Sequence, residues 1–127
     1  KEIATYKPDL FFTHFINDLN LDHRIVAESV TIATRLYKKK HTILNFEVLS
    51  STNLKLGGKK NIFIPNFYVD IKSTIKNKIK AMKEYKSEIH NFPHPRSEEG
   101  LLLLSKYRGM FAGFEYAEAF YMLKKTI

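Results

Sequence analysis

The sequence predicts an α/β fold, because short apolar runs alternate with helical patterns along the chain. Leu10 to Thr13 is a short apolar run of the kind found in a parallel strand covered on both faces. From Arg24 to about Tyr37, apolar residues recur at steps of three and four, which predicts an amphipathic helix. His41 to Leu49 then has the apolar and β-branched content of a second strand.

The middle of the chain predicts more extended structure and a second helix. Gly57-Gly58 is expected to form a turn, and Ile62 to Val69 is extended around Pro65. A helix follows Asp70, with Ser73 as its N-cap. Its apolar positions share one face: Ile71, Ile75, Ile79, Met82 and Ile89.

The last third of the chain predicts a loop, a helix and a return to the sheet. Two prolines place Phe92 to Arg96 in a loop. Ser97, followed by two glutamates, is the predicted N-cap of a helix that ends at Arg108-Gly109. Gly113 to Leu123 is apolar and aromatic, which indicates a final segment in the sheet.

The composition is that of one globular domain, expected to comprise residues 1–127, with 44% apolar residues. Cysteine is absent from the sequence, which excludes disulfides and thiolate metal sites and suits a reducing interior. There is no signal-peptide pattern, and the longest apolar run, Leu101 to Leu104, is far shorter than the roughly 20 residues of a membrane span. We therefore expect a cytoplasmic protein without a membrane span.

The charge of the chain raises the question of nucleic-acid binding, since the net charge is +8 and the isoelectric point is near 9.6. The lysines, however, are spread over several segments, including Lys38 to Lys40 and Lys72 to Lys86, and are not interleaved with aromatic residues. This pattern argues against nucleic acid as a partner. It favours a solvated basic surface that attracts an anionic sugar or nucleotide-sugar.

The candidate site is the stretch from Asp18 to His23, between the first predicted strand and the first predicted helix. In an α/β fold this junction falls at the carboxyl edge of the sheet, where ligands gather beside helix amino termini. The stretch holds two carboxylates, Asp18 and Asp22, and the imidazole of His23. These groups in this place predict a metal site or an acid–base site.

Residues of this stretch also have purely structural interpretations. Asp22 either orients its neighbours or caps the helix. The carboxylate that holds the imidazole tautomer is either Asp22 or Asp18. Asp18 otherwise contacts a substrate hydroxyl or forms a loop turn, and Asn20 is either a substrate ligand or a turn former. Two other histidines, His41 and His90, belong to no motif and are expected at the surface.

The loop with two prolines contains His94 and Arg96, which we expect to lie near the substrate. A stiff backbone lowers the entropy cost of holding a functional side chain in place. Arg96 either grips a phosphate or carboxylate through two hydrogen bonds or pins the loop by pairing with Glu98 or Glu118.

Blocks along the chain resemble the LmbE-like (PIG-L) N-deacetylases, whose second signature motif is similar to Thr13-His14 and Asp18 to Arg24. Further blocks match in the order of that family: Glu47–Thr52, Pro65–Ile71, Pro93–Ser97, Arg108-Gly109 and Ala117–Phe120. Together they cover nearly the whole chain. The resemblance is nearest to a bacterial branch associated with surface sugars and nucleotide-linked sugars.

This resemblance implies a Rossmann-like α/β fold and a zinc-dependent hydrolase that removes the acetyl group from an N-acetylated sugar or nucleotide-sugar. It implies His23 as a zinc ligand and Asp22 as a catalytic residue that orients its neighbours. The histidine that does acid or oxyanion work in the family falls on Asn20, so His14 or His94 is expected to take that catalytic role. The candidates for substrate binding are Asp18, Asn20 and Arg96.

The first motif of that family, His-x-Asp-Asp, is absent from the sequence. We therefore expect the carboxyl-terminal portion of a deacetylase domain, with a partial zinc site, no activity alone, and the amino-terminal half of the domain as its partner. The apolar face left open would also favour a homo-oligomer. The alternative is a non-catalytic binding or assembly module of the same fold.

Overall fold

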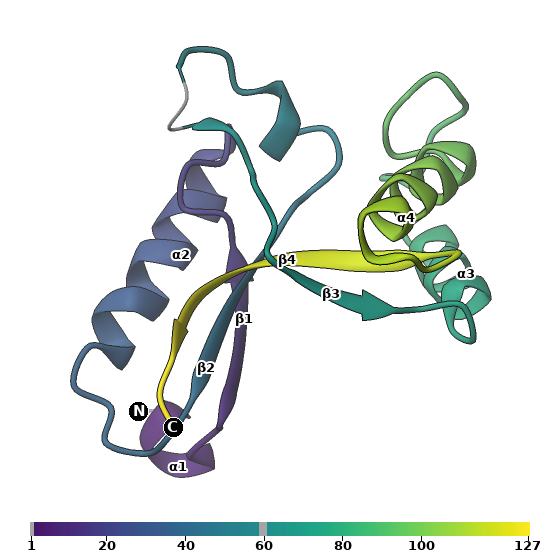
Figure 1. The fold of residues 1–127 in the computed structure, drawn as a ribbon. Helices are drawn as coiled ribbons and strands as arrows, with labels where there is room; N and C mark the ends of the chain where they lie inside the picture. Colours follow the sequence, from purple (N-terminus) through teal and green to yellow (C-terminus); the bar gives the residue numbers. More distant parts are fainter. Residues whose placement is uncertain (1, 59–60) are drawn as a thin grey trace. The chain divides into compact units, whose positions relative to one another are not determined.

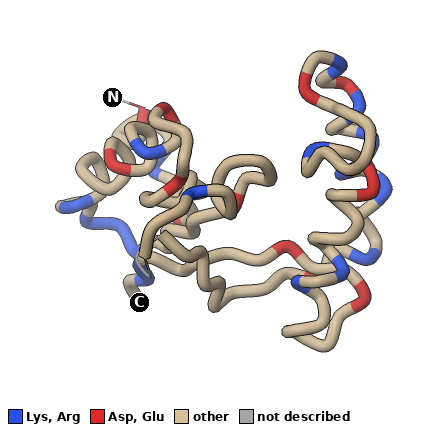
Figure 2. The backbone as a smooth tube through the Cα atoms, turned by 90° about the horizontal axis from the view of Figure 1, so that it is seen from above, with Lys and Arg blue, Asp and Glu red and all other residues tan. Residues whose placement is uncertain are grey.

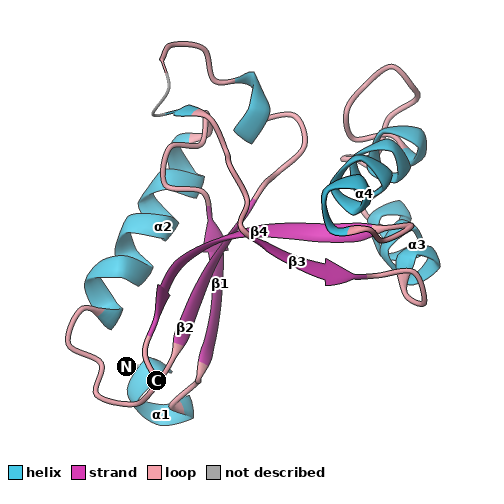
Figure 3. Cartoon of the chain, viewed as in Figure 1, coloured by secondary structure: helices cyan, strands magenta, loops and turns pink. Residues whose placement is uncertain are grey.

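The computed structural model of the protein describes residues 2–58 and 61–127 (Figure 1). Its elements, in chain order, are α1 (Glu2–Tyr6), β1 (Leu10–His14), α2 (Leu21–Thr34), β2 (Thr42–Phe46), the short 3-10 helix η1 (Thr52–Leu54), β3 (Phe67–Asp70), α3 (Ile75–Glu84), α4 (Glu98–Ala112) and β4 (Ala117–Lys125). The four strands form a mixed sheet in the order β1-β2-β4-β3, with helices flanking it (Figure 3). The predicted α/β class is confirmed.

The chain divides into two compact units. Unit 1 comprises Lys1–Asn66 and Phe120–Ile127, and unit 2 comprises Phe67–Ala119. Strand β4 contributes to both, because its first residues, Ala117–Ala119, belong to unit 2. Unit 1 therefore contains β1, α2 and β2, whereas unit 2 contains β3, α3 and α4.

In unit 1, β1 and β2 run parallel, with Leu10 opposite Thr42 and His14 opposite Phe46. Helix α2 connects the two strands and contacts β1. Strand β2 also pairs antiparallel with β4. Because parallel strands end at the same edge of a sheet, the segments that follow β1 and β2 meet there.

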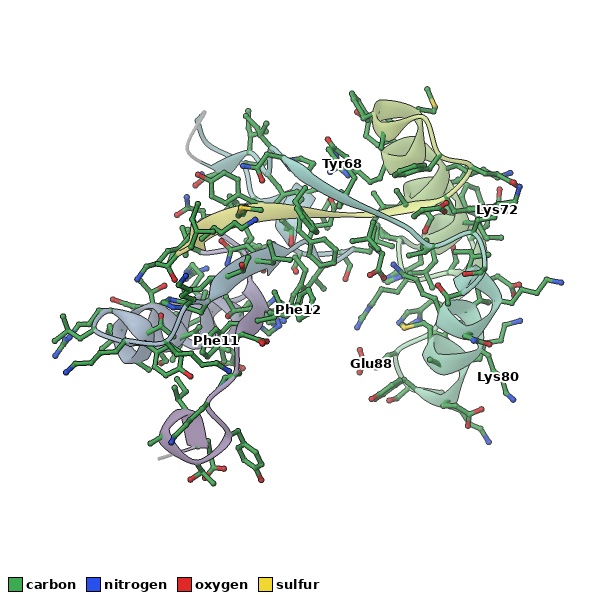
Figure 4. All side chains as sticks on the ribbon, turned by 60° about the horizontal axis from the view of Figure 1, so that its bottom comes forward. Phe11, Phe12, Tyr68, Lys72, Lys80 and Glu88 are labelled. Atoms are coloured by element: carbon green, nitrogen blue, oxygen red, sulfur yellow. The ribbon has the colours of Figure 1, made fainter. Side chains whose placement is uncertain are left out.

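The side chains of β1 alternate between the two faces of the sheet (Figure 4). The Phe11 ring packs edge-on against Tyr37 and His41, with centroids 5.7 and 5.8 Å away. His41 is therefore buried, and its predicted surface position is wrong. Phe12 contacts Phe120 at 5.4 Å but is 53% exposed, so the prediction that both faces of β1 are covered is also wrong.

Helix α2 begins earlier and ends earlier than predicted. Asn20 is its N-cap, and the Asn20 side chain accepts a hydrogen bond from the Asp22 N–H at 2.9 Å. The predicted start at Arg24 is therefore wrong. The prediction that Asp22 caps the helix is wrong as well, because Asn20 is the cap. The helix ends at Thr34, whose hydroxyl donates to the Val30 carbonyl at 2.7 Å.

In unit 2, α3 begins after Thr74 and ends at Glu84, so the predicted cap Ser73 and the distal Ile89 lie outside the helix. The predicted apolar face is confirmed at Ile75 and Ile79, which are buried, whereas Ile71 is buried but precedes the helix. Lys80 lies on the exposed side of the same helix (Figure 4).

Helix α4 follows the predicted cap, since the Ser97 hydroxyl accepts the Gly100 N–H at 2.9 Å. It continues past the predicted end at Arg108-Gly109 and stops at Gly113, whose φ of 73° is left-handed. Gly109 lies inside the helix, where a Cβ atom would be 2.4 Å from the Phe114 carbonyl oxygen. Gly109 therefore does not end the helix; its lack of a side chain lets the backbone at Phe114 approach closely.

Basic residues are spread along the chain in both units (Figure 2). Several lysines of unit 2 pair with glutamates: Lys72 with Glu115 at 2.8 Å, Lys78 with Glu118 at 2.6 Å and Lys83 with Glu98 at 2.5 Å. In the part of the chain that the structure describes, no helix has both the length and the apolar character needed to cross a membrane.

Candidate active site

Side chains from two separate segments meet at the carboxyl edge of the sheet in unit 1. Asp18 lies in the loop between β1 and α2, whereas Ser51 and Thr52 follow β2 at the start of η1. These segments are distant in sequence and come together because β1 and β2 are parallel neighbours.

Asp18 is the centre of this cluster, and it is fully buried. Its Oδ2 accepts the hydroxyl of Thr52 at 2.5 Å and that of Ser51 at 3.1 Å. Its Oδ1 accepts the Asn20 N–H at 2.8 Å and lies 3.1 Å from Nδ1 of His23. Each carboxylate oxygen therefore has two partners, and the buried group is satisfied.

The charge state of Asp18 follows from these contacts. Burial alone would raise its pKa, because burial disfavours the charged form. Hydrogen bonds from Thr52, from the Asn20 N–H and from Ser51, together with the nearby His23, outweigh burial and hold the pKa below its usual value. At neutral pH Asp18 is therefore a carboxylate that only accepts hydrogen bonds.

The ring of His23, in the first turn of α2, is set by Asp18. Since the carboxylate only accepts, we assign the ring hydrogen to Nδ1, which donates to Asp18. Nε2 then keeps its lone pair, the form that binds a metal ion or a proton. The His23 ring stacks on that of His14, with centroids 4.1 Å apart and planes 16° from parallel.

His14 is the last residue of β1 and is half-buried. Its Nδ1 is buried and has no hydrogen-bond partner among the described residues. Phe46 lies against the ring at 4.7 Å, and the Asn45 amide donates to the His14 carbonyl at 2.8 Å. Burial, followed by the neighbouring His23, lowers the pKa of His14, so the ring is neutral at pH 7 and can accept a proton.

The loop that contains Asp18 is held by its neighbours. The Arg24 guanidinium donates to the Asp18 carbonyl at 2.8 Å and to the next carbonyl at 2.7 Å. Asn20 adds the cap of α2. The carboxylate beside the His23 ring is that of Asp18, whereas Asp22 is exposed on the first turn of the helix. Of the two carboxylates predicted to hold the imidazole, Asp18 is the one in contact with the His23 ring.

A catalytic zinc site uses three protein ligands and keeps one position open. Within residues 2–58 and 61–127, no group of three His, Cys, Asp or Glu side chains is arranged to hold a metal ion. His23 offers Nε2, and His14 lies beside it, but both oxygens of Asp18 are engaged by other donors. The described side chains therefore supply fewer ligands than a complete zinc site needs.

His94 belongs to unit 2, whereas the cluster around Asp18 belongs to unit 1. Nδ1 of His94 accepts the Arg96 N–H at 3.0 Å, and its ring centroid is 4.1 Å from that of His90. Burial, then His90 and Arg96, lower the pKa of His94. Because Nδ1 is an acceptor, the neutral ring carries its hydrogen on Nε2.

Arg96 also belongs to unit 2, and its guanidinium pairs with Glu88. Glu98 and Glu118, which were the predicted partners of Arg96 in a structural ion pair, pair with lysines instead. The ion pair pins the loop to the segment that follows α3, so the structural interpretation of Arg96 has a partner that the sequence did not indicate.

The structure brings five of the predicted site residues together in unit 1: His14, Asp18, Asn20, Asp22 and His23. It adds Ser51 and Thr52, for which no role was predicted. The available signals were their place after the second predicted strand and their membership of the block Glu47–Thr52, which resembles the deacetylases.

Comparison with known protein families does not narrow the function of the site. No protein-family model matches the chain. A functional proposal therefore depends on the side chains of the site and on the sequence blocks that resemble the deacetylases.

Proposed function

We propose that the protein is part of a metal-dependent hydrolase that removes the acetyl group from an N-acetylated sugar or nucleotide-linked sugar, with the Rossmann-like fold of the LmbE-like enzymes. The observation that supports this most is the pairing of His23 with the buried Asp18 at the carboxyl edge of the sheet. A histidine whose other ring nitrogen is held by a carboxylate is the usual form of a metal ligand.

In this proposal His23 is one zinc ligand. The remaining ligands come from a polypeptide segment with a His-x-Asp-Asp motif, which the 127 residues do not contain. The amino-terminal half of the domain is the proposed source of that segment. The incomplete ligand set among the described residues is compatible with this division.

Hydrolysis of an amide also needs a group that moves a proton to the leaving amine. His14 is in place for this step, since it stacks on His23 and its lowered pKa keeps it neutral. A neutral ring first takes up the proton that the attacking water loses and then gives it to the leaving amine. His94 is the alternative for the oxyanion part of this role, because its Nε2–H can donate a hydrogen bond to the developing oxyanion.

The exposure of each side chain indicates which residues are free to contact a substrate. Asp18 is fully buried with both oxygens occupied, so we propose that it orients His23 rather than touching a sugar. Asn20 and Asp22 are exposed next to it and are the better candidates for sugar hydroxyls. Arg96, paired with Glu88, remains a candidate for an anionic substrate group.

The test is a zinc analysis and a deacetylation assay on protein that contains both this chain and the His-x-Asp-Asp segment. His23→Ala should lose zinc and activity against N-acetylglucosamine or a nucleotide-linked N-acetyl sugar. The control is His90→Ala, an exposed histidine of unit 2, which should keep its zinc content. Unchanged zinc in His23→Ala would exclude this ligand.

Exposed apolar side chains favour a second candidate function, an assembly module without catalysis. They lie on α2 and on the edge strand β1: Leu10, Phe12, Leu21, Ile25, Val26 and Ile32. Apolar surface of this kind marks interaction sites. An assembly module would keep its association when His23 is replaced, and it would need no zinc.

A further inference from the structure

We propose that Asp18, Ser51 and Thr52 act as positioning residues that fix the tautomer and orientation of the His23 ring. The inference deepens the proposed function and rests on it, because a ligand role for His23 requires Nε2 without a hydrogen. Ser51 and Thr52 come from the segment after β2, so this assigns a role to a part of the chain outside the loop that contains His23.

The two oxygens of Asp18 accept hydrogen bonds from different segments of the chain. Oδ2 accepts only from the segment after β2, through Thr52 and Ser51. Oδ1 accepts from the segment that leads into α2, through the Asn20 N–H and the His23 ring. The carboxylate therefore cannot rotate away from His23 without losing the hydroxyls on its other side.

The Thr52 hydroxyl has a defined direction. Its oxygen accepts the backbone N–H of Val48 at 2.7 Å, which leaves its own hydrogen for Asp18 at 2.5 Å. A continuous chain of hydrogen bonds thus runs from the Val48 backbone through Thr52 and Asp18 to His23. Buried chains of this kind strengthen each member and fix its orientation.

The His23 ring responds when this series of hydrogen bonds is interrupted. With the carboxylate held in place, only Nδ1–H of His23 makes a hydrogen bond to it. If Asp18 loses its anchor and turns, the ring is free to carry its hydrogen on either nitrogen. Outer partners of metal-ligating histidines typically contribute about 10–100-fold to metal affinity.

The chain offers matched variants for a test. Thr52→Val removes the hydroxyl that donates to Asp18, whereas Thr52→Ser keeps it. The control is Thr34→Val, which makes the same change at another buried threonine of unit 1, whose hydroxyl donates to Val30 at the far end of α2. If Asp18→Asn fails to fold, these three variants still answer the question.

The experiment is NMR correlation of the ring hydrogens and nitrogens of His23 in the metal-free protein. We expect the hydrogen on Nδ1 in the wild-type protein, in Thr52→Ser and in Thr34→Val, and a mixture of tautomers in Thr52→Val. A wild-type ring with its hydrogen on Nε2 would overturn the proposal. An unchanged His23 ring in Thr52→Val would overturn it as well.

A second measurement separates this inference from the function on which it rests. Titration with Zn²⁺ alone should show affinity at His23 that is about 10–100-fold weaker in Thr52→Val than in Thr34→Val. Equal affinity in these two variants would overturn the positioning role. If no variant of this chain binds Zn²⁺ at His23 while the tautomer still changes in Thr52→Val, the positioning role is supported. Ligation by His23 is then decided by the zinc analysis of the protein that also contains the His-x-Asp-Asp segment.

Discussion

Asp18 decides the geometry of the site at the scale of single residues, since it is fully buried and touches both the segment after β2 and the His23 ring. In Asp18→Asn, one carboxylate oxygen becomes a donor that faces another donor. We expect the free energy of unfolding to fall by about 1–3 kcal/mol, measured by urea denaturation. Asp22→Asn, an exposed carboxylate on the first turn of α2, is the control, and equal losses in both variants would contradict the account.

Asp18 also predicts how stability depends on pH. Although burial alone would raise its pKa, the hydrogen bonds from Thr52, the Asn20 N–H and Ser51 hold the pKa below the usual 3.8. A carboxyl with a depressed pKa stabilises the fold above the pKa of the unfolded chain, and this contribution is lost as the pH falls through the folded pKa. We expect the urea concentration at the midpoint of unfolding to decrease as the pH is lowered below about 4. Asp18→Asn should show a shallower acid dependence, and identical profiles would exclude this role.

Residue types and positions were sufficient to predict part of the site. Asp18 and His23 were predicted because carboxylates and an imidazole follow a strand at the carboxyl edge. The hydroxyls of Ser51 and Thr52 were not, since their contact with Asp18 depends on the pairing of two distant strands. A local pattern contains no information about that contact.

The cap of α2 gives a prediction at the scale of elements. Asn20→Ala removes the oxygen that accepts the Asp22 N–H, and caps of this kind contribute about 0.5–2 kcal/mol. We expect a loss of that size in thermal or urea unfolding, and recovery in Asn20→Ser, because serine is also a good N-cap. A stable Asn20→Ala protein with weakened sugar binding would instead favour a substrate role for Asn20.

Replacing a glycine in α4 by alanine is predicted to lower stability, although the same change in a helix usually raises it. Replacing a helical glycine by alanine normally stabilises a helix by about 0.5–1 kcal/mol. At Gly109, however, the new Cβ would lie 2.4 Å from the Phe114 carbonyl oxygen, so the backbone must shift. We expect Gly109→Ala to destabilise the protein by about 1–3 kcal/mol in urea denaturation.

The control for that change is Met110→Ala on the same helix, because Met110 is 77% exposed. It should leave stability nearly unchanged. A Gly109→Ala protein that is more stable than the wild type would show that the close approach in α4 is absent.

Helical periodicity predicted the elements better than their ends. The apolar face of α3 and the Ser97 cap of α4 were predicted from spacing and from residue type. The true end of α4 was missed, because Gly109 has the appearance of a helix stop until its contact with Phe114 is known. Ends of helices depend on such contacts more than on periodicity.

For the whole molecule, the sequence predicted the α/β class but not the order of the strands. The order β1-β2-β4-β3 joins the last strand to the middle of the sheet. Periodicity describes each segment by itself, whereas this order depends on pairing between segments far apart in the chain.

The exposed apolar surface of unit 1 predicts self-association of the isolated chain. Ile25 on α2 is 52% exposed and Phe12 on β1 is 53% exposed, and β1 is an edge of the sheet. We expect light scattering to show a mass that rises with protein concentration, and a smaller rise in Ile25→Lys. A monomer at all concentrations would contradict the account of an open apolar face.

The central claim is that His23, held by Asp18, is a metal ligand. The most direct measurement is a titration with Zn²⁺ of the protein that also contains the His-x-Asp-Asp segment, followed through the ring NMR signals of the five histidines of this chain. The account predicts that the His23 signals change at the lowest Zn²⁺ concentration and that the exposed His90 responds later. A response that begins at His90 or His94 while His23 stays unchanged would contradict it.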